Sequence, residues 1–163
     1  MSDNTRKHVT SIDAARDLAH ETELHATCIA VDGSGVVLTG DSGSGKSALG
    51  LQLIVGGGQL VADDVTAIYR DGPRLIARAP VHGAGMIESW GNGILRVPFV
   101  GHAPVSFFVE LVNALSGRLP EPAYRTELDV AVPLLRVEAR HPTSAALIRL
   151  AVSRGAPHIP DTL

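Results

Sequence analysis

GDSGSGKS, at residues 40–47, matches the pattern G-x-x-x-x-G-K-[ST] of a phosphate-binding P-loop. Glycines let successive backbone N–H groups turn toward a phosphate without obstruction by a Cβ atom. Lys46 can place a positive charge on the β- and γ-phosphates, and the Ser47 hydroxyl can bind Mg²⁺ where a helix begins. The nucleotide-binding candidates are Gly40, Asp41, Ser42, Gly43, Ser44, Gly45, Lys46 and Ser47.

The flanking sequence supports this interpretation. Residues 35–39 form a short apolar run that predicts a buried strand entering the loop. Residues 47–54 predict a helix leaving it, despite Gly50, and three glycines at 56–58 end that helix. A chain with 17 glycines can match the loop pattern by chance, but strand, loop and helix agree here.

Composition limits the class of protein. A chain of 163 residues with 45% apolar and 19% charged residues predicts one globular domain with its own core. The net charge of -3 provides no basic field for nucleic acid. A single cysteine, Cys28, excludes an internal disulfide and is expected to pack in a strand. With no apolar run long enough to span a membrane and a polar N-terminus, we expect a cytoplasmic protein without membrane contact.

The order of the expected elements argues against a doubly wound fold, in which strands and helices alternate. Residues 25–31 and 36–39 predict a hairpin around a glycine turn, and many short strands follow the loop helix. We therefore expect an α/β fold with a mixed, strand-rich sheet, in which Pro133 marks an edge position or a strand end. Residues 1–24 are expected to form an N-terminal extension with a short helix at 11–19, and residues 25–163 a single domain. Further strands are expected at 60–62, 65–70, 74–79, 86–90, 94–97, 105–112 and 130–137, a surface loop at 119–122 and a helix at 145–153.

Asp63 and Asp64 close the strand at 60–62 shortly after the loop helix. One carboxylate can hold Mg²⁺ and the other can accept a proton from an incoming hydroxyl. Two ionised carboxylates at one place repel each other, so a metal ion or Lys46 must offset their charge. Paired acids are also common in solvated turns, but their place after a P-loop favours a role in phosphoryl transfer.

The loop followed by LVADD at residues 60–64 resembles the bacterial HPr kinase/phosphorylase family. His25 matches a family histidine in an HG(V/T) motif, although Ala26 replaces the glycine. Residues 83–88 are similar to the family's RGLGIID stretch, and residues 89–96 are a weaker match to its LFGAGAVR. The similarity covers about residues 25–96 and resembles the short form that consists of the kinase domain alone.

The resemblance implies a P-loop kinase domain whose wider architecture is shared with phosphoenolpyruvate carboxykinase. It implies an ATP- and Mg²⁺-dependent kinase for a serine of the phosphocarrier HPr or its nitrogen-branch relative, with phosphorolysis by inorganic phosphate as the reverse reaction. Members assemble as hexamers. Asp63 would then be the general base, Asp64 a support for the metal, Ser47 a metal ligand, Lys46 a phosphate contact, and His25 a group near the phosphates.

The chain departs from the family at two neighbouring positions. Pro80 replaces a glutamate thought to help with the metal, and His82 replaces the arginine before the glycine. Glu88 is a candidate for the missing carboxylate, and Arg136 and Arg140 are candidates for stabilising transition-state charge. Two alternatives therefore stay open: a small-metabolite kinase of the same architecture, and a nucleotide-sensing module without transfer activity, which the missing carboxylate suggests.

Overall fold

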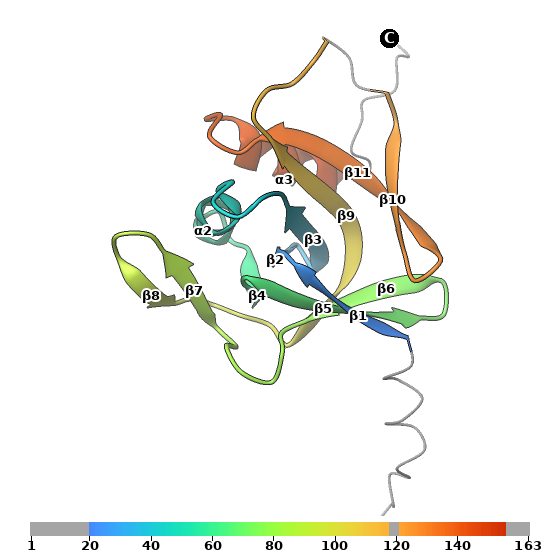
Figure 1. Cartoon of the computed structure of the whole chain (residues 1–163), viewed down its shortest axis with the longest axis horizontal. Helices are drawn as coiled ribbons and strands as arrows, with labels where there is room; N and C mark the ends of the chain where they lie inside the picture. Colours follow the sequence, from blue (N-terminus) through green and yellow to red (C-terminus); the bar gives the residue numbers. More distant parts are fainter. Residues whose placement is uncertain (1–19, 118–120, 156–163) are drawn as a thin grey trace, which may run out of the picture.

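The computed structural model describes residues 20–117 and 121–155. This part of the chain contains eleven strands and two helices, drawn in Figure 1. Among these residues, neither helix has the length and apolar character needed to cross a bilayer. The elements are β1 (Glu21–His25), β2 (Thr27–Val31), β3 (Ser34–Thr39), α2 (Lys46–Val55), β4 (Gln59–Ala62), β5 (Val65–Asp71), β6 (Arg74–Arg78), β7 (Met86–Ser89), β8 (Gly93–Arg96), β9 (His102–Val112), β10 (Ala123–Glu127), β11 (Val130–Glu138) and α3 (Ser144–Arg154).

A long strand, β9, organises the main sheet. Residues 102–104 pair antiparallel with β6, and residues 105–110 and 108–112 pair parallel with β3 and β11. The sheet therefore continues in one direction through β6, β5 and β1, and in the other through β3, β2 and β4. Figure 1 shows β1, β5 and β6 below β2 and β3. The mixed, strand-rich α/β fold expected from the sequence is observed.

Two apolar clusters fill the space between the layers. One lies between the sheet and the two helices and includes Leu49 and Leu53 of α2 and Ile148 of α3, all at most 1% exposed. The other joins the two parts of the sheet and includes Cys28, Ile68 and Phe108. The core depends on aliphatic side chains because aromatic residues make up only 4% of the chain. The end of β3, from which the loop of residues 40–45 emerges, thus lies between two apolar cores.

Several predicted elements are confirmed. β2 and β3 form the expected antiparallel hairpin. The loop helix is observed as α2, and the backbone N–H groups of residues 56–58 bond the carbonyls of Gln52, Ile54 and Leu53, which ends it. The strands predicted around residues 60–112 are all present with boundaries shifted by a few residues.

Some predictions were wrong. The single strand expected at 25–31 is two strands, of which β1 begins at Glu21 and pairs with β5. β10 was missed, so β11 is not an edge strand; Pro133 opposes Tyr124 of β10, and pairing with β9 begins only at Leu134. Proline is tolerated there because β9 requires no N–H from it. The helix expected at 11–19 lies outside the described residues.

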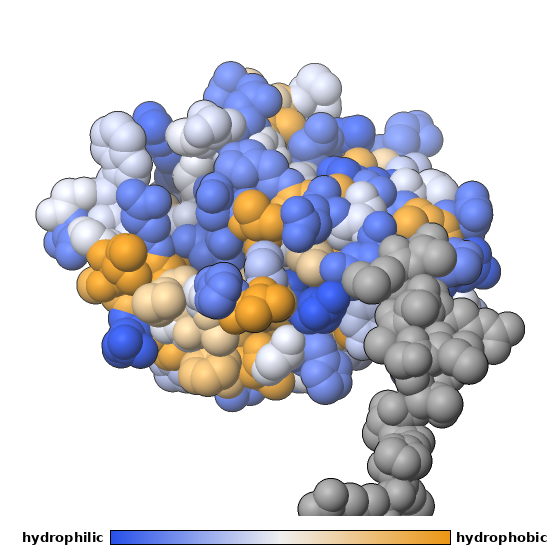
Figure 2. Space-filling model, turned by 60° about the horizontal axis from the view of Figure 1, so that its bottom comes forward, coloured by the Kyte–Doolittle hydropathy of each residue, from blue (hydrophilic) through white to orange (hydrophobic). Residues whose placement is uncertain are grey.

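β7 and β8 form a separate two-stranded sheet that projects from the body in Figure 1. Its turn leaves the side chains of Trp90 and Ile94 95% and 71% exposed. Figure 2 shows apolar residues gathered on the left of the visible face, the side from which this hairpin projects in Figure 1. The hairpin also contacts the residue after β4, because the backbone N–H of Glu88 donates a hydrogen bond to Asp63.

Candidate functional site

The loop of residues 40–45 joins the carboxyl end of β3 to the amino end of α2. Gly40, Gly43 and Gly45 have φ angles of 147°, 75° and 103°, a region that L side chains rarely adopt. A Cβ on Gly40 would also stand 2.8 Å from Ser44 Oγ, and one on Gly45 would stand 3.2 Å from Ala139 Cβ. The loop can therefore be built only with glycine at these places, and α2 begins directly after it, with its N-terminal dipole toward the loop.

Lys46 lies inside the loop that it follows. Its side chain is 7% exposed, and Nζ donates hydrogen bonds of 2.9 Å to the carbonyl oxygens of Gly40 and Asp41. Ser44 Oγ is buried and has no hydrogen-bond partner among the residues that the structure describes. A buried cation, an unpartnered hydroxyl and a helix amino end suit an anion such as a phosphate.

Asp63 is the point at which separate elements meet. Oδ1 accepts hydrogen bonds from Ser47 Oγ at the start of α2, at 2.9 Å, and from Thr27 Oγ1 of β2, at 2.7 Å. Oδ2 accepts a bond of 3.0 Å from the backbone N–H of Glu88 in β7. The carboxylate thus lies against the first turn of the loop helix.

Asp64 makes different contacts. Its backbone has a φ of 64°, and its carbonyl oxygen accepts a bond from the N–H of Ala26 between β1 and β2. Its carboxylate lies 3.2 Å from His25 Nδ1, and the two side chains are 75% and 51% exposed. At that exposure the pair stabilises the fold little. The structure therefore joins His25 to Asp64, whereas Asp63 accepts a hydrogen bond from the loop helix.

The other candidate residues, Glu88, Arg136 and Arg140, lie in different places around Asp63 and the loop. Glu88 contributes its backbone N–H, and its side chain is exposed. Arg136 forms an ion pair of 2.7 Å with Glu110, whose register partner on β3 is Thr39, so this pair lies at the edge from which the loop emerges. Arg140 is exposed and follows Ala139, the residue that approaches Gly45.

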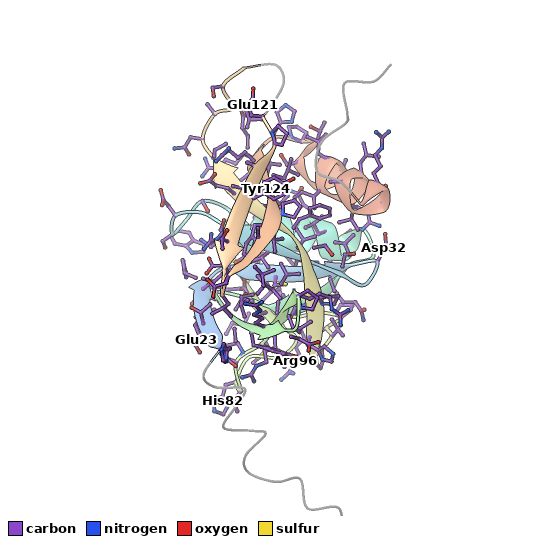
Figure 3. The ribbon with its side chains drawn as sticks, turned by 90° about the vertical axis from the view of Figure 1, so that its right-hand side faces the viewer. Glu23, Asp32, His82, Arg96, Glu121 and Tyr124 are labelled. Carbon is purple, nitrogen blue, oxygen red and sulfur yellow. The ribbon has the colours of Figure 1, made fainter. Side chains whose placement is uncertain are left out.

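A cavity of about 420 Å³ opens beside Asp63. Glu23, Pro80 and His82 line it and also line a neighbouring cavity of about 320 Å³. Figure 3 shows Glu23 and His82 at the same end of the molecule. Pro80, which stands where a carboxylate was expected, is thus beside the site, and Glu23 supplies a carboxylate to the same cavity.

The sequence analysis missed Thr27 and Glu23. Thr27 has one signal, a hydroxyl at the start of the otherwise apolar stretch TCIAV, in a strand whose five residues are all buried. Glu23 has none, because β1 was taken for part of an extension and its pairing with β5 depends on residues far along the chain.

The described part of the chain offers few side-chain ligands for a magnesium ion. In residues 20–117 and 121–155, no three His, Cys, Asp or Glu side chains are grouped so that they could hold a metal. Mg²⁺ commonly needs only one or two protein oxygen ligands when phosphates and water complete its octahedron. Ser47 Oγ and the Asp63 carboxylate, in direct contact beside the loop, fit that requirement.

Comparison with known proteins gives consistent results. HPr kinase/phosphorylase of Clostridium beijerinckii is 44% identical over 88 residues, which is 54% of this chain and 29% of that protein. The enzyme of the same name from Burkholderia lata is 45% identical over 84 residues, 51% of this chain and 26% of that protein. The chain thus spans less than a third of the length of these curated relatives.

A solved structure extends the similarity beyond the half of the chain that these relatives match. The structure titled Hpr(Ser) kinase/phosphatase from Coxiella burnetii matches with a TM-score of 0.70 and 33% identity, over 82% of this chain and 89% of that one. The family described as HPr Serine kinase C-terminal domain matches residues 16–111, which is more than half of the chain. With the fold, the glycine loop and the acidic residue beside it in agreement, this chain belongs to the HPr serine kinase C-terminal domain family.

Proposed function

We propose that this chain is an ATP- and Mg²⁺-dependent protein serine kinase that acts on HPr or its nitrogen-branch relative. The observation that carries the proposal is the 2.9 Å contact between Asp63 and Ser47, which brings a carboxylate to the amino end of the loop helix. The family and the names of the relatives supply the substrate class.

The phosphate donor would lie in the loop of residues 40–47. Backbone N–H groups and the helix amino end would bind the β- and γ-phosphates, and Ser44 Oγ would gain a partner. Lys46 Nζ would exchange its two carbonyl acceptors for phosphate oxygens. Mg²⁺, held by Ser47 and the Asp63 carboxylate, would offset the charge that develops on the transferred group. Asp64 was predicted to help hold the metal; its carboxylate lies 3.2 Å from His25 Nδ1, and Asp64 lines the same cavity as Asp63.

Asp63 would act as the general base. The serine hydroxyl would enter from the cavity of about 420 Å³, and Asp63 would accept its proton while the serine oxygen bonds to the γ-phosphorus and the bond to the leaving ADP oxygen breaks. In the reverse direction inorganic phosphate would take the place of ADP as acceptor and the serine would regain the proton. Most of the rate enhancement would come from positioning and from charge neutralisation.

The remaining expectations belong to the same proposal. His25 would act next to the phosphates through its contact with Asp64. Arg136, Arg140 and Glu88 remain candidates near the edge of the site. The likeness to phosphoenolpyruvate carboxykinase and the hexamer are predictions from the family, and the cytoplasmic location and the single domain at residues 25–163 are predictions from the sequence.

The test is transfer to protein. The purified chain is incubated with an HPr-like carrier, ATP labelled on the γ-phosphate, and Mg²⁺, with EDTA in a parallel sample. Label on the carrier that disappears with EDTA is expected. Consumption of ATP without label on any carrier would favour a small-metabolite kinase, and nucleotide binding without turnover would favour a sensing module.

A further inference from the structure

Thr27 is a buried hydroxyl aimed at the proposed base. It is the first residue of β2, its exposure is 0%, and Oγ1 lies 2.7 Å from Asp63 Oδ1. The remaining residues of this strand are apolar or cysteine, so the hydroxyl is the strand's one polar side chain apart from the thiol. A buried hydroxyl needs a partner, and the structure supplies the carboxylate of Asp63.

The methyl group of Thr27 is fixed from the other side. A Cβ placed on Gly50 of α2 would lie 3.2 Å from Thr27 Cγ2, 3.3 Å from Ile29 Cδ1 and 3.5 Å from Ile87 Cδ1. The helix therefore approaches β2 closely where residue 50 has no side chain. Because threonine is branched at Cβ, packing of its methyl group also fixes the direction of its hydroxyl.

The three donors to Asp63 differ in how firmly they are held. Ser47 Oγ lies at the edge of the loop and is proposed to face Mg²⁺. The N–H of Glu88 comes from a projecting hairpin with an exposed side chain at that position. Thr27 alone of the three is fully buried, and it begins β2, the strand between β3 and β4.

We propose that Thr27 is a positioning residue for the transfer reaction, which holds the Asp63 carboxylate in the orientation that accepts the serine proton, and that Gly50 allows α2 to lock Thr27 in place. This inference rests on the proposed function. It assigns to Gly50 a role that helix formation cannot explain, since glycine in a helix interior is less favourable than alanine.

The kinetic test compares three variants. Thr27→Val keeps the shape and removes the hydroxyl, so kcat should fall about 10- to 100-fold because the base is displaced, with the KM for ATP unchanged. Thr27→Ser restores the hydroxyl and should recover most of kcat. Thr66→Val is the matched control, since Thr66 is also 0% exposed but its hydroxyl bonds the carbonyl of Ala26. Equal loss of kcat in Thr27→Val and Thr66→Val would overturn the inference, because both would then report only a weakened sheet.

A second measurement does not depend on activity. Three-bond proton couplings of the Asp63 Cα–Cβ bond, measured by NMR in the full chain, report whether the side chain keeps one staggered rotamer. We expect one rotamer in the unaltered chain, in Thr27→Ser and in Thr66→Val, and averaged couplings in Thr27→Val. Unchanged couplings in Thr27→Val would overturn the inference. Should Thr27→Val fail to fold, Thr27→Ala replaces it in both measurements.

The two proposals can fail separately. If the unaltered chain transfers no phosphate to a carrier, the proposed function fails and the Asp63 couplings alone decide whether Thr27 orients this carboxylate. If the chain transfers phosphate but Thr27→Val has an unchanged kcat, only the inference on Thr27 is overturned.

Discussion

Replacement of Asp63 by asparagine tests the proposed base with little change of shape. The carboxylate accepts three hydrogen bonds, two on Oδ1 and one on Oδ2. An amide has one acceptor oxygen, so if that oxygen stays with Thr27 and Ser47, the amide nitrogen faces the N–H of Glu88, donor against donor. Asp63→Asn therefore loses one bond outright and weakens two others from a charged to a neutral acceptor.

The cost to stability follows from these contacts. A hydrogen bond to a charged group contributes about 1.5–3 kcal/mol and a neutral one about 0.5–1.5 kcal/mol. Glu88 is exposed, so water can serve the freed N–H, and the neutral amide is easier to bury than a charge. We expect a net loss of about 1–3 kcal/mol, which lowers Tm by about 2–4 °C for each kcal/mol in a chain of this size.

The cost to activity should be larger. Loss of a general base lowers the rate by about 10²- to 10⁴-fold, whereas nucleotide affinity should stay close to the original because the loop is intact. Asp64→Asn is the matched control: its side chain is 75% exposed, so stability should change by no more than about 0.5 kcal/mol and kcat should fall less. The assays are thermal unfolding, calorimetric titration with nucleotide and transfer to a carrier. If Asp63→Asn binds nucleotide normally and transfers phosphate at an unreduced rate, Asp63 is not the base.

Three further outcomes are expected. Lys46→Met should weaken nucleotide binding at least about tenfold in a calorimetric titration, because Nζ is the buried cation of the loop, and unchanged affinity would place the phosphates elsewhere. Gly50→Ala should fail to give the gain of about 1 kcal/mol usual for a helical glycine in urea unfolding, because the new Cβ crowds Thr27; the full gain with unchanged activity would contradict the packing argument. Burial raises the pKa of the Cys28 thiol above its ordinary value of 9.0, so the native chain should resist alkylation at pH 8. The Cys28 contribution to stability should be complete below pH 9.0 and decline above it by up to about 1.4 kcal/mol per pH unit, as the unfolded thiol ionises, and a Cys28→Ala variant that keeps the same decline would refute this source.

Local sequence patterns predicted the centre of the site. The glycines of the loop, the helix after it and the acidic end of the next strand are encoded within residues 35–64, and each feature has a local physical cause. Asp63 and Ser47 are 16 residues apart in the chain, and the strand that ends before Asp63, β4, is separated from the loop strand β3 by β2. The acids at the end of β4 were therefore predictable from local sequence, whereas their contact with α2 also depends on the order of these strands.

Contacts between distant segments were not predictable. Thr27 lies 36 residues from Asp63, and its direction depends on how closely α2 approaches β2. The two acids at 63 and 64 line one cavity, but the carboxylate of Asp64, whose backbone is left-handed, lies against His25, whereas that of Asp63 contacts Ser47. Asp64 has φ > 0 without being glycine. Aspartate adopts this conformation more readily than most residues, but the sequence around Asp64 did not predict it.

The strand boundaries failed for a related reason. β1 and β10 are short and carry polar residues, and each is stabilised by pairing with a strand that follows it, β5 and β11. Such strands depend on their neighbours more than on their own composition. Pro133 was predicted to lie at a sheet edge because proline ordinarily does. β11 has a neighbour on both sides, but its register leaves Pro133 paired with β10 only.

The central claim is that the carboxylate beside the glycine loop activates a serine of a carrier protein. The most direct measurement is mass spectrometry of an HPr-like carrier after incubation with this chain, ATP and Mg²⁺, with fragmentation to locate the phosphate. The account predicts one added phosphate on a serine, present with the unaltered chain and nearly absent with Asp63→Asn. Phosphate on another residue type, or ATP consumed with no phosphate on the carrier, would contradict it.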